Sequence, residues 1–372
     1  MCGIAFTSVS ALADDDIVVP RDFPTIQAAV NAATPGATIK VRRGTYTEQI
    51  VIAKDLTLKG DGMGKTIIKS PSTLTPFAEN TLSGIPVATI VQITDGAHVR
   101  LSEVTVTGPT PCGVGVRGIS VVKASTLNLS DSRVTLIRPA DSTCRIEFLS
   151  TGITIGLPQF FEIDGEGGSI GHGTVSHVQI DRFLSTGIAV LGPFEGPPST
   201  ATISDNVITG GTPFTTLGQN GISVSFAAVA RVMGNTVHGT VCTDPAACGR
   251  DPINESQSSG IGTNSNPPGT VIEENTISGN DAGIYLFGSE GCCQTRENTV
   301  RNNRFFGILI QDGSNNTEKN DIWGGEVGVG VVADFVDTVA VLHGDKIKKT
   351  SVLPVQEISC CGFTATAIIE DK

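Results

Sequence analysis

A short phrase recurs along this chain at nearly constant spacing. It joins an Asn-x-Ile/Val step to a Gly-Ile/Val step that follows eight or nine residues later. The clearest copies start at Asn275, Asn298 and Asn320, and they contain Gly283, Gly307 and Gly328. These glycines lie 24 and 21 residues apart, which is the length of one rung of a solenoid. A single rung would bury too few apolar side chains to be stable, so the repeat predicts a stack.

The same phrase continues upstream with longer gaps. The glycines that begin its second step are Gly118, Gly152, Gly187, Gly221 and Gly260, and they lie 34, 35, 34 and 39 residues apart. The rungs in this part of the chain therefore carry insertions. Asn206 and Asn235 hold the same place as the three later asparagines. We expect these five amides to stack as a ladder at one corner of the solenoid.

Each phrase predicts short β-strands. Its Ile, Val and Leu residues alternate with other residues, so every second side chain points to one side of a strand. Gly, Asn, Asp and Ser stand between the strands, as is typical of turns. In this register Ile222 points into the stacked core.

This pattern resembles the right-handed parallel β-helix repeat proteins, the broad pectate-lyase-like superfamily, over roughly residues 88–350. The resemblance implies an all-β solenoid, and it implies little about activity because function lives in sites grafted onto a fold. The opening, residues 18–70, is similar to that of pectin methylesterases and of many exported β-helix proteins. The catalytic Gln-Asp-Thr-Leu, Asp-Phe-Ile-Phe-Gly and Gly-Arg-Pro-Trp segments of those esterases are absent, so we do not expect an esterase.

The chain is expected to form one elongated domain, residues 14–372, and to be a monomer. Residues 18–70 would supply an N-terminal cap and the first rungs, residues 88–350 the repeats, and residues 351–372 a C-terminal cap. Between residues 25 and 33, Ile26, Ala29, Val30 and Ala33 fall on one face of a predicted short helix. This helix would cover the open N-terminal end of the solenoid.

Residues 1–13 are interpreted as the end of a secretory signal, because Ala11-Leu12-Ala13 resembles a cleavage site. The alternative is a disordered N-terminus. The signal predicts a secreted or cell-envelope protein, extracellular or periplasmic, and the nine cysteines fit export. Cys112 with Cys144 and Cys242 with Cys248 are plausible disulfides. The vicinal pairs Cys292-Cys293 and Cys360-Cys361 raise the alternative of a thiolate metal site. No stretch reaches the ~18 apolar residues of a membrane span.

The charge balance limits the partners. A net charge of −12 and a pI near 4.9 argue against nucleic acids and anionic membranes, both of which require a basic surface. A polyanionic glycan is also disfavoured unless Ca²⁺ bridges carboxylates on both sides. Ca²⁺ is accordingly the one cofactor that we consider.

The long rungs from Gly152 to Gly260 predict a groove, since repeat proteins keep insertions mainly at the binding face. A dense polar group there supplies the candidate site. We nominate Asp164, His172 and Asp181 as catalytic, because two carboxylates with an imidazole can supply acid, base and cation contacts. Glu162, Glu166 and His177 are nominated as substrate-binding. The alternative is that all six are solvated loop side chains.

The expected function is the binding of a polysaccharide, with cleavage by a lyase or glycoside hydrolase reaction as the enzymatic version. The competing class is a non-catalytic extracellular surface, binding or structural protein, which the missing family motifs favour.

Overall fold

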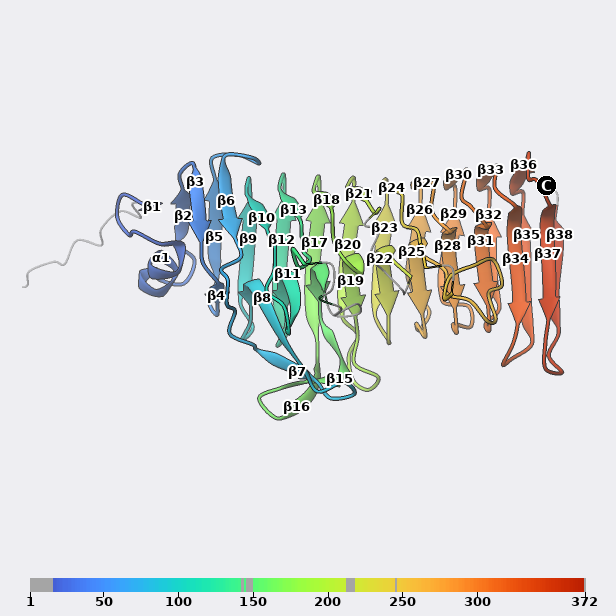
Figure 1. The fold of residues 1–372 in the computed structure, drawn as a ribbon, viewed down its shortest axis with the longest axis horizontal. Coiled ribbons are helices and arrows are strands. Elements are labelled where there is room, and N and C mark those ends of the chain that lie inside the picture. Colours follow the sequence, from blue (N-terminus) through green and yellow to red (C-terminus); the bar gives the residue numbers. More distant parts are fainter. Residues whose placement is uncertain (1–15, 142–143, 145–149, 212–217, 245, 371–372) are drawn as a thin grey trace, which may run out of the picture.

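The protein is an elongated stack of three-stranded rungs (Figure 1). The computed structural model describes residues 16–141, 144, 150–211, 218–244 and 246–370. The predicted signal, residues 1–13, lies outside them. In successive rungs the chain passes through three parallel sheets in the order C, A, B, so each strand pairs with its counterparts in the rungs before and after it.

Sheet A contains β1 (Ile17–Val19), β2 (Thr38–Val41), β5 (Leu56–Gly60), β9 (His98–Ser102), β12 (Ser125–Ser130), β17 (Gly171–Ser176), β20 (Thr200–Ser204), β23 (Val229–Met233), β26 (Thr270–Glu273), β29 (Cys293–Arg296), β32 (Asn315–Glu318), β35 (Thr338–His343) and β38 (Ala365–Glu370). Sheet B contains β3 (Gly44–Thr47), β6 (Thr66–Lys69), β10 (Thr105–Thr107), β13 (Arg133–Thr135), β18 (Gln179–Asp181), β21 (Val207–Thr209), β24 (Thr236–His238), β27 (Thr276–Ser278), β30 (Thr299–Arg301), β33 (Asp321–Trp323) and β36 (Lys346–Lys348).

Sheet C contains β4 (Ile50–Ile52), β8 (Ile85–Ile93), β11 (Gly115–Val121), β14 (Thr151–Ile155), β19 (Thr186–Leu191), β22 (Asn220–Ser225), β25 (Ser259–Asn264), β28 (Ala282–Phe287), β31 (Phe306–Gln311), β34 (Val327–Ala333) and β37 (Leu353–Ser359). An antiparallel extension of this sheet is formed by β7 (Ala78–Asn80), β15 (Leu157–Ile163) and β16 (Glu166–Ser169). The extension projects from the body of the solenoid (Figure 1).

The core is a column of inward-facing aliphatic side chains. On sheet C, Ile153, Ile188, Ile222, Ile261 and Ile284 pair in register and are all fully buried. The predicted inward register of Ile222 is therefore confirmed.

The glycine that precedes each of these residues lies close to the backbone of the next rung. A Cβ added at Gly283 would lie 2.5 Å from the carbonyl oxygen of Gly307, and one at Gly307 would lie 2.6 Å from that of Gly328. The same clash recurs at Gly118, Gly152, Gly187, Gly221 and Gly260. The repeated glycine is required because only hydrogen fits between the stacked backbones.

Side-chain ladders hold two of the three corners. At the corner between sheets A and B, the amide of Asn206 donates to Asn235, and the series continues through Asn275, Asn298 and Asn320 at 2.9–3.0 Å. The predicted ladder of five amides is confirmed, and Asp345 closes it by accepting from Asn320 at 2.7 Å. At the corner between sheets B and C, Asn280 accepts from Thr240 and donates to Asn303.

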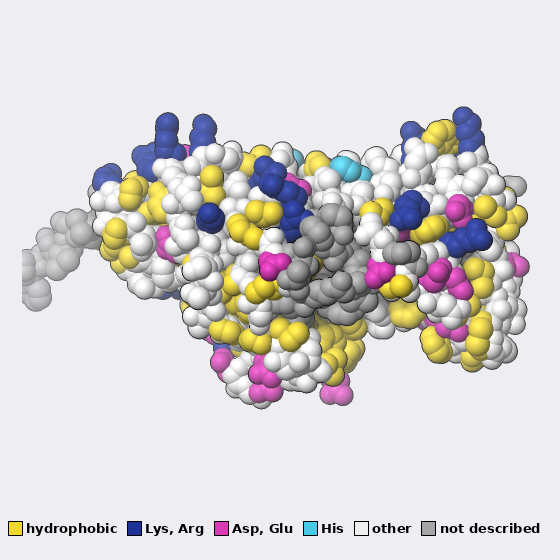
Figure 2. Space-filling model, in the orientation of Figure 1, with side chains coloured by type: hydrophobic (Ala, Val, Ile, Leu, Met, Phe, Trp, Pro, Cys, Tyr) yellow, Lys and Arg dark blue, Asp and Glu magenta, His cyan; other side chains and the backbone are white. Residues whose placement is uncertain are grey.

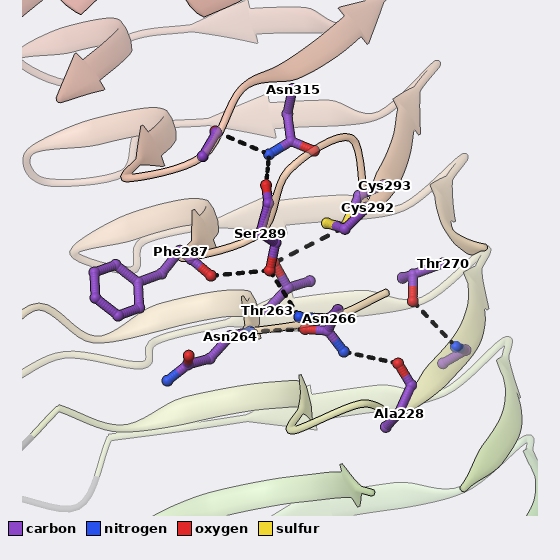
Figure 3. Close-up of a disulfide and its surroundings, with 12 residues drawn as sticks. Ala228, Thr263, Asn264, Asn266, Thr270, Phe287, Ser289, Cys292, Cys293 and Asn315 are labelled. Carbon is purple, nitrogen blue, oxygen red and sulfur yellow. Dashed lines mark hydrogen bonds between the residues drawn. A yellow bond between two sulfur atoms is a disulfide. The ribbon is translucent and has the colours of Figure 1, made fainter. Parts of the chain in front are cut away.

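The corner between sheets C and A contains one of the vicinal cysteine pairs (Figure 3). Cys292 and Cys293 form a disulfide at the start of β29. Beside it, Ser289 accepts from the backbone N–H of Asn266 at 2.9 Å, and Asn315 donates to the Ser289 carbonyl at 2.7 Å. These bonds satisfy buried polar groups that the turns would otherwise leave unpaired.

Three further disulfides are present. The two predicted pairs, Cys112–Cys144 and Cys242–Cys248, are confirmed. Cys360 and Cys361 are also joined to each other.

The two ends of the solenoid differ. At the N-terminal end, α1 (Ile26–Ala32) begins after its cap Thr25 and buries Ile26, Ala29 and Val30, as predicted. In the segment expected to form the C-terminal cap, β37 pairs with β34 and β38 pairs with β35. The described residues include no helix long and apolar enough to cross a membrane.

Candidate functional site

Three of the nominated residues lie on the projecting extension. Glu162 is on β15, Glu166 is on β16, and Asp164 has a left-handed backbone at the turn between them. The Asp164 carboxylate forms an ion pair with Lys123, which also lies 3.4 Å from Asp95. Figure 2 shows hydrophobic side chains gathered on the extension and acidic side chains at its tip.

The two nominated histidines lie near opposite ends of β17. His172 is on the outer face of sheet A, where its Nδ1 is 2.8 Å from the Thr200 hydroxyl. His177 directly follows β17 and has a φ of 55°, as do its counterparts Asp205, Glu274 and Glu297 to within a degree. The backbone therefore uses this position as a turn in every such rung.

Asp181 ends β18 on sheet B. Its carboxylate lies 2.7 Å from Arg133 and 3.0 Å from Arg182, and it accepts a hydrogen bond from Thr135. Burial alone would raise the pKa of Asp181, but the hydrogen bonds from Thr135, Arg133 and Arg182 outweigh it and lower the pKa below its ordinary value. A carboxylate that is held ionised is poorly suited to act as a general acid.

The six residues are thus distributed over the extension, the face of sheet A, one corner and sheet B. Within the described residues, no hydrogen bond or ion pair joins any two of Asp164, His172 and Asp181. Their catalytic role, and the substrate-binding role of Glu162, Glu166 and His177, stay predictions.

The metal predictions find little support in the donor groups. In the part of the chain that the structure describes, one group of three potential ligands lies within 4.8 Å, namely Asp334, Cys360 and Cys361. Its two sulfurs are joined as a disulfide, so they offer no thiolate. Ca²⁺ requires six to eight oxygen ligands, which this group does not supply. Calcium binding stays a prediction.

A groove of about 350 Å³ lies on the outer face of sheet C over the middle rungs. We call it the sheet C groove. Its lining residues come from β19, β22, β25 and β28 and the turns beside them: Leu191, Asn220, Ser223, Ser225, Phe226, Gln257, Ser259, Gly262, Thr263, Asn264, Tyr285 and Phe287. Its size falls in the ordinary range of small-ligand sites.

The floor of the groove is set by three residues in register. Ser223 pairs with Gly262, and Gly262 pairs with Tyr285. Gly262 has no side chain, so the floor of the groove is lowest at Gly262, between the Ser223 hydroxyl and the Tyr285 ring. Polar side chains flank this row, with Ser259 donating to Asn220 at 2.6 Å and the hydroxyls of Ser223 and Ser225 2.9 Å apart.

Aromatic rings stand on both sides of the low floor. On β28, Tyr285 and Phe287 meet edge to face with ring centroids 5.9 Å apart. After β22, Phe226 meets Phe194 and Phe160 edge to face, each at 5.4 Å. Phe160 belongs to β15, so the projecting extension supports this wall.

Gln257 enters the groove from the insertion between β24 and β25. Its side chain is 9% exposed, and neither atom of its amide has a hydrogen-bond partner within the described residues. A buried amide without partners costs about 1–3 kcal/mol, so such groups are few in native proteins and each calls for an explanation.

Asp281 holds the two ends of this insertion against the solenoid. Its fully buried carboxylate accepts from the backbone N–H groups of Cys242 at 2.7 Å and Ser258 at 3.1 Å, and it pairs with Arg304 at 2.7 Å. Arg304 also donates to the Cys242 carbonyl at 3.2 Å. Both ends of the insertion are therefore held against the solenoid, and this fixes the position of Gln257.

The insertion also borders a larger groove, of about 830 Å³, over the C-terminal rungs. Charged side chains line it, including Asp251, Asp334 and the ion pair of Arg250 with Glu326 at 3.8 Å. The two grooves on sheet C differ in chemistry, since the lining of the smaller one has no charged residue.

Comparison with known proteins identifies the architecture. The family model described as "Right handed beta helix region" matches residues 161–338. The chain therefore has the fold of a right-handed parallel β-helix. No curated protein matches this β-helix.

Several solved structures are similar to this chain at low sequence identity. The Dettilon tailspike protein has a TM-score of 0.54 and 12% identity, over 86% of this chain and 62% of that one. The Agl-KA catalytic domain has a TM-score of 0.51 and 13% identity, over 99% and 69%. The A-module of the mannuronan C-5 epimerase AlgE4 from Azotobacter vinelandii has a TM-score of 0.48 and 13% identity, over 93% and 92%. For the tailspike protein and the Agl-KA domain, the likeness at these identities concerns the fold alone.

Proposed function

We propose that this β-helix protein binds a polysaccharide in the sheet C groove. The observation that carries the proposal is the buried, unpaired amide of Gln257 beside a floor of hydroxyls and aromatic rings. Sugars present hydroxyl groups at their edges and C–H groups on their ring faces. The groove offers amide and hydroxyl partners for the former and the rings of Tyr285 and Phe226 for the latter.

The lining favours binding over cleavage. Hydrolysis of a glycosidic bond ordinarily uses a pair of carboxylates, and no Asp, Glu or His is among the residues that line the sheet C groove. Of the two functions considered from the sequence, we therefore prefer non-catalytic binding at this site.

Export remains part of the proposal. The four disulfides support it, because disulfides persist in oxidising compartments and are rare in the cytosol.

Binding is tested with a panel of soluble plant and bacterial polysaccharides and the variant Gln257→Leu. We expect Gln257→Leu to lose about tenfold or more in affinity for the glycan that the wild type binds, since one buried hydrogen-bonding amide is worth about 1–3 kcal/mol. Gln179→Leu is the matched control, because Gln179 is exposed on β18 of sheet B. Equal affinity of Gln257→Leu and the wild type would place the site elsewhere.

Cleavage is tested on the same panel through new reducing ends and unsaturated-uronate absorbance. If the nominated residues are catalytic, Asp164→Asn or Asp181→Asn will abolish turnover with little change in fold. We expect no turnover by the wild type. Turnover that Asp164→Asn or Asp181→Asn removes would show that the sequence-based site is the active one.

A further inference from the structure

The lining of the sheet C groove is entirely uncharged. Its twelve residues include amides, hydroxyls, aliphatic groups and aromatic rings, but no Lys, Arg, Asp, Glu or His. This is not a property of sheet C as a whole, because Arg250, Asp251 and Glu326 line the larger groove of the C-terminal rungs.

A negative charge acts on the floor of the groove. Asp312 follows β31 and raises the pKa of Tyr285 in addition to the larger effect of burial, so the two groups interact electrostatically. The oxygen Oδ1 of Asp312 accepts from the backbone N–H groups of Asp334 and Phe335, each at 2.8 Å, and no ion pair of Asp312 is found among the described residues. The carboxylate of a ligand in the groove would be repelled by the negative charge of Asp312, and no cationic side chain of the lining would offset this repulsion.

Tyr285 remains a neutral hydrogen-bonding group. Its raised pKa keeps the phenol protonated, and its hydroxyl donates to Gln311 at 2.5 Å. Tyr285 therefore contributes an uncharged aromatic side chain to the lining of the groove.

The unpaired amide of Gln257 has one face that donates and one that accepts. A sugar hydroxyl can accept from Nε2 and donate to Oε1 at the same time. A carboxylate can only accept, so it would leave Oε1 of Gln257 facing another oxygen. Recognition of carboxylates ordinarily uses Arg or Lys, and a buried charge without a partner is costly.

We infer that the sheet C groove selects uncharged sugar residues and rejects uronates. This inference rests on the proposed function and specifies its substrate class as a neutral glycan.

The test uses acidic polysaccharides paired with their own carboxyl-reduced forms, which keep the linkage and lose the charge. Alginate, polygalacturonate and hyaluronate, together with their reduced forms and a set of neutral glucans, mannans and galactans, are titrated into the wild type and Gln257→Leu. Each titration is run once with EDTA and once with CaCl₂. Gln179→Leu again serves as the control.

We expect binding to be confined to neutral members, with any acidic parent at least about tenfold weaker than its reduced form, and Gln257→Leu to lose that binding. An acidic parent that binds as well as its reduced form, with or without Ca²⁺, would overturn the selectivity while leaving polysaccharide binding intact. Absence of binding to every neutral and acidic member would overturn both the selectivity and the proposed function.

Discussion

At the residue scale, the repeated glycine carries a steric requirement that can be tested directly. In Gly283→Ala, the new methyl group would lie 2.5 Å from the Gly307 carbonyl oxygen and 2.6 Å from a methyl group of Val300. We expect the free energy of unfolding to fall by about 1–3 kcal/mol, as in overpacked cores, measured by urea denaturation.

Gly262→Ala is the control for this substitution. Gly262 lies on the outer face, and the nearest atom to its new Cβ would be the rotatable hydroxyl of Ser259 at 2.7 Å. Its stability should stay within about 0.5 kcal/mol of the wild type. Equal stability of Gly283→Ala and Gly262→Ala would contradict the steric explanation of the repeat.

Residue-level prediction from sequence succeeded where a residue recurs. The Asn206 to Asn320 ladder and the inward register of Ile222 could be predicted because the same residue types recur in successive rungs. When the rungs stack, residues at equivalent positions contact each other. Gln257 lies in an insertion and does not recur in the other rungs, so the sequence repeat does not single it out. Its significance depends on burial without a partner, which only the packed structure reveals.

At the scale of elements, the insertion between β24 and β25 depends on one buried carboxylate. Burial raises the pKa of Asp281 above its ordinary value of 3.8, against the opposing effects of its hydrogen bonds and Arg304. Below that ordinary value Asp281 is protonated in both folded and unfolded states. As the pH rises, the unfolded state ionises first, so the contribution of Asp281 to stability falls until the folded pKa is passed.

Asp281→Asn removes this dependence. We therefore expect the stability of the wild type relative to Asp281→Asn to decrease as the pH rises from about 3.8, measured by denaturant unfolding across the pH range. A relative stability that increases with pH would show that Arg304 dominates and that the folded pKa is lowered.

The insertions also show the limit of sequence reasoning about elements. The long rungs from Gly152 to Gly260 predicted a binding groove beside them, and the sheet C groove that we propose spans β19 to β28. The density of acidic residues led to a predicted site within residues 162–181. In the structure, the nominated residues of this segment lie on the extension and on sheets A and B. The spacing of residues in the sequence predicts neither the path of an insertion nor the ion pairs of Asp164 and Asp181.

The outward-facing row of Ser223, Gly262 and Tyr285 occupies equivalent positions of three successive rungs. This row is the sequence signal from which the floor of the groove could have been predicted.

At the scale of the whole molecule, three continuous sheets make the chain a rigid rod with one end covered by α1. Such a scaffold holds side chains from separate rungs in fixed register, so a binding surface needs only the right outward residues on neighbouring strands. The sheet C groove is such a surface, with its floor drawn from β22, β25 and β28.

The most direct test of the account fills the floor of the groove. Gly262→Val adds a side chain between Ser223 and the Tyr285 ring at a position that needs no positive φ, and β-branched residues suit strands. Ser176→Val is the control on the outer face of sheet A. By titration with the neutral glycan that the wild type binds, we predict that Gly262→Val loses at least about tenfold in affinity while Ser176→Val is unchanged, with both variants melting like the wild type. Wild-type affinity in Gly262→Val would contradict the account, because the glycan could not then lie in the sheet C groove.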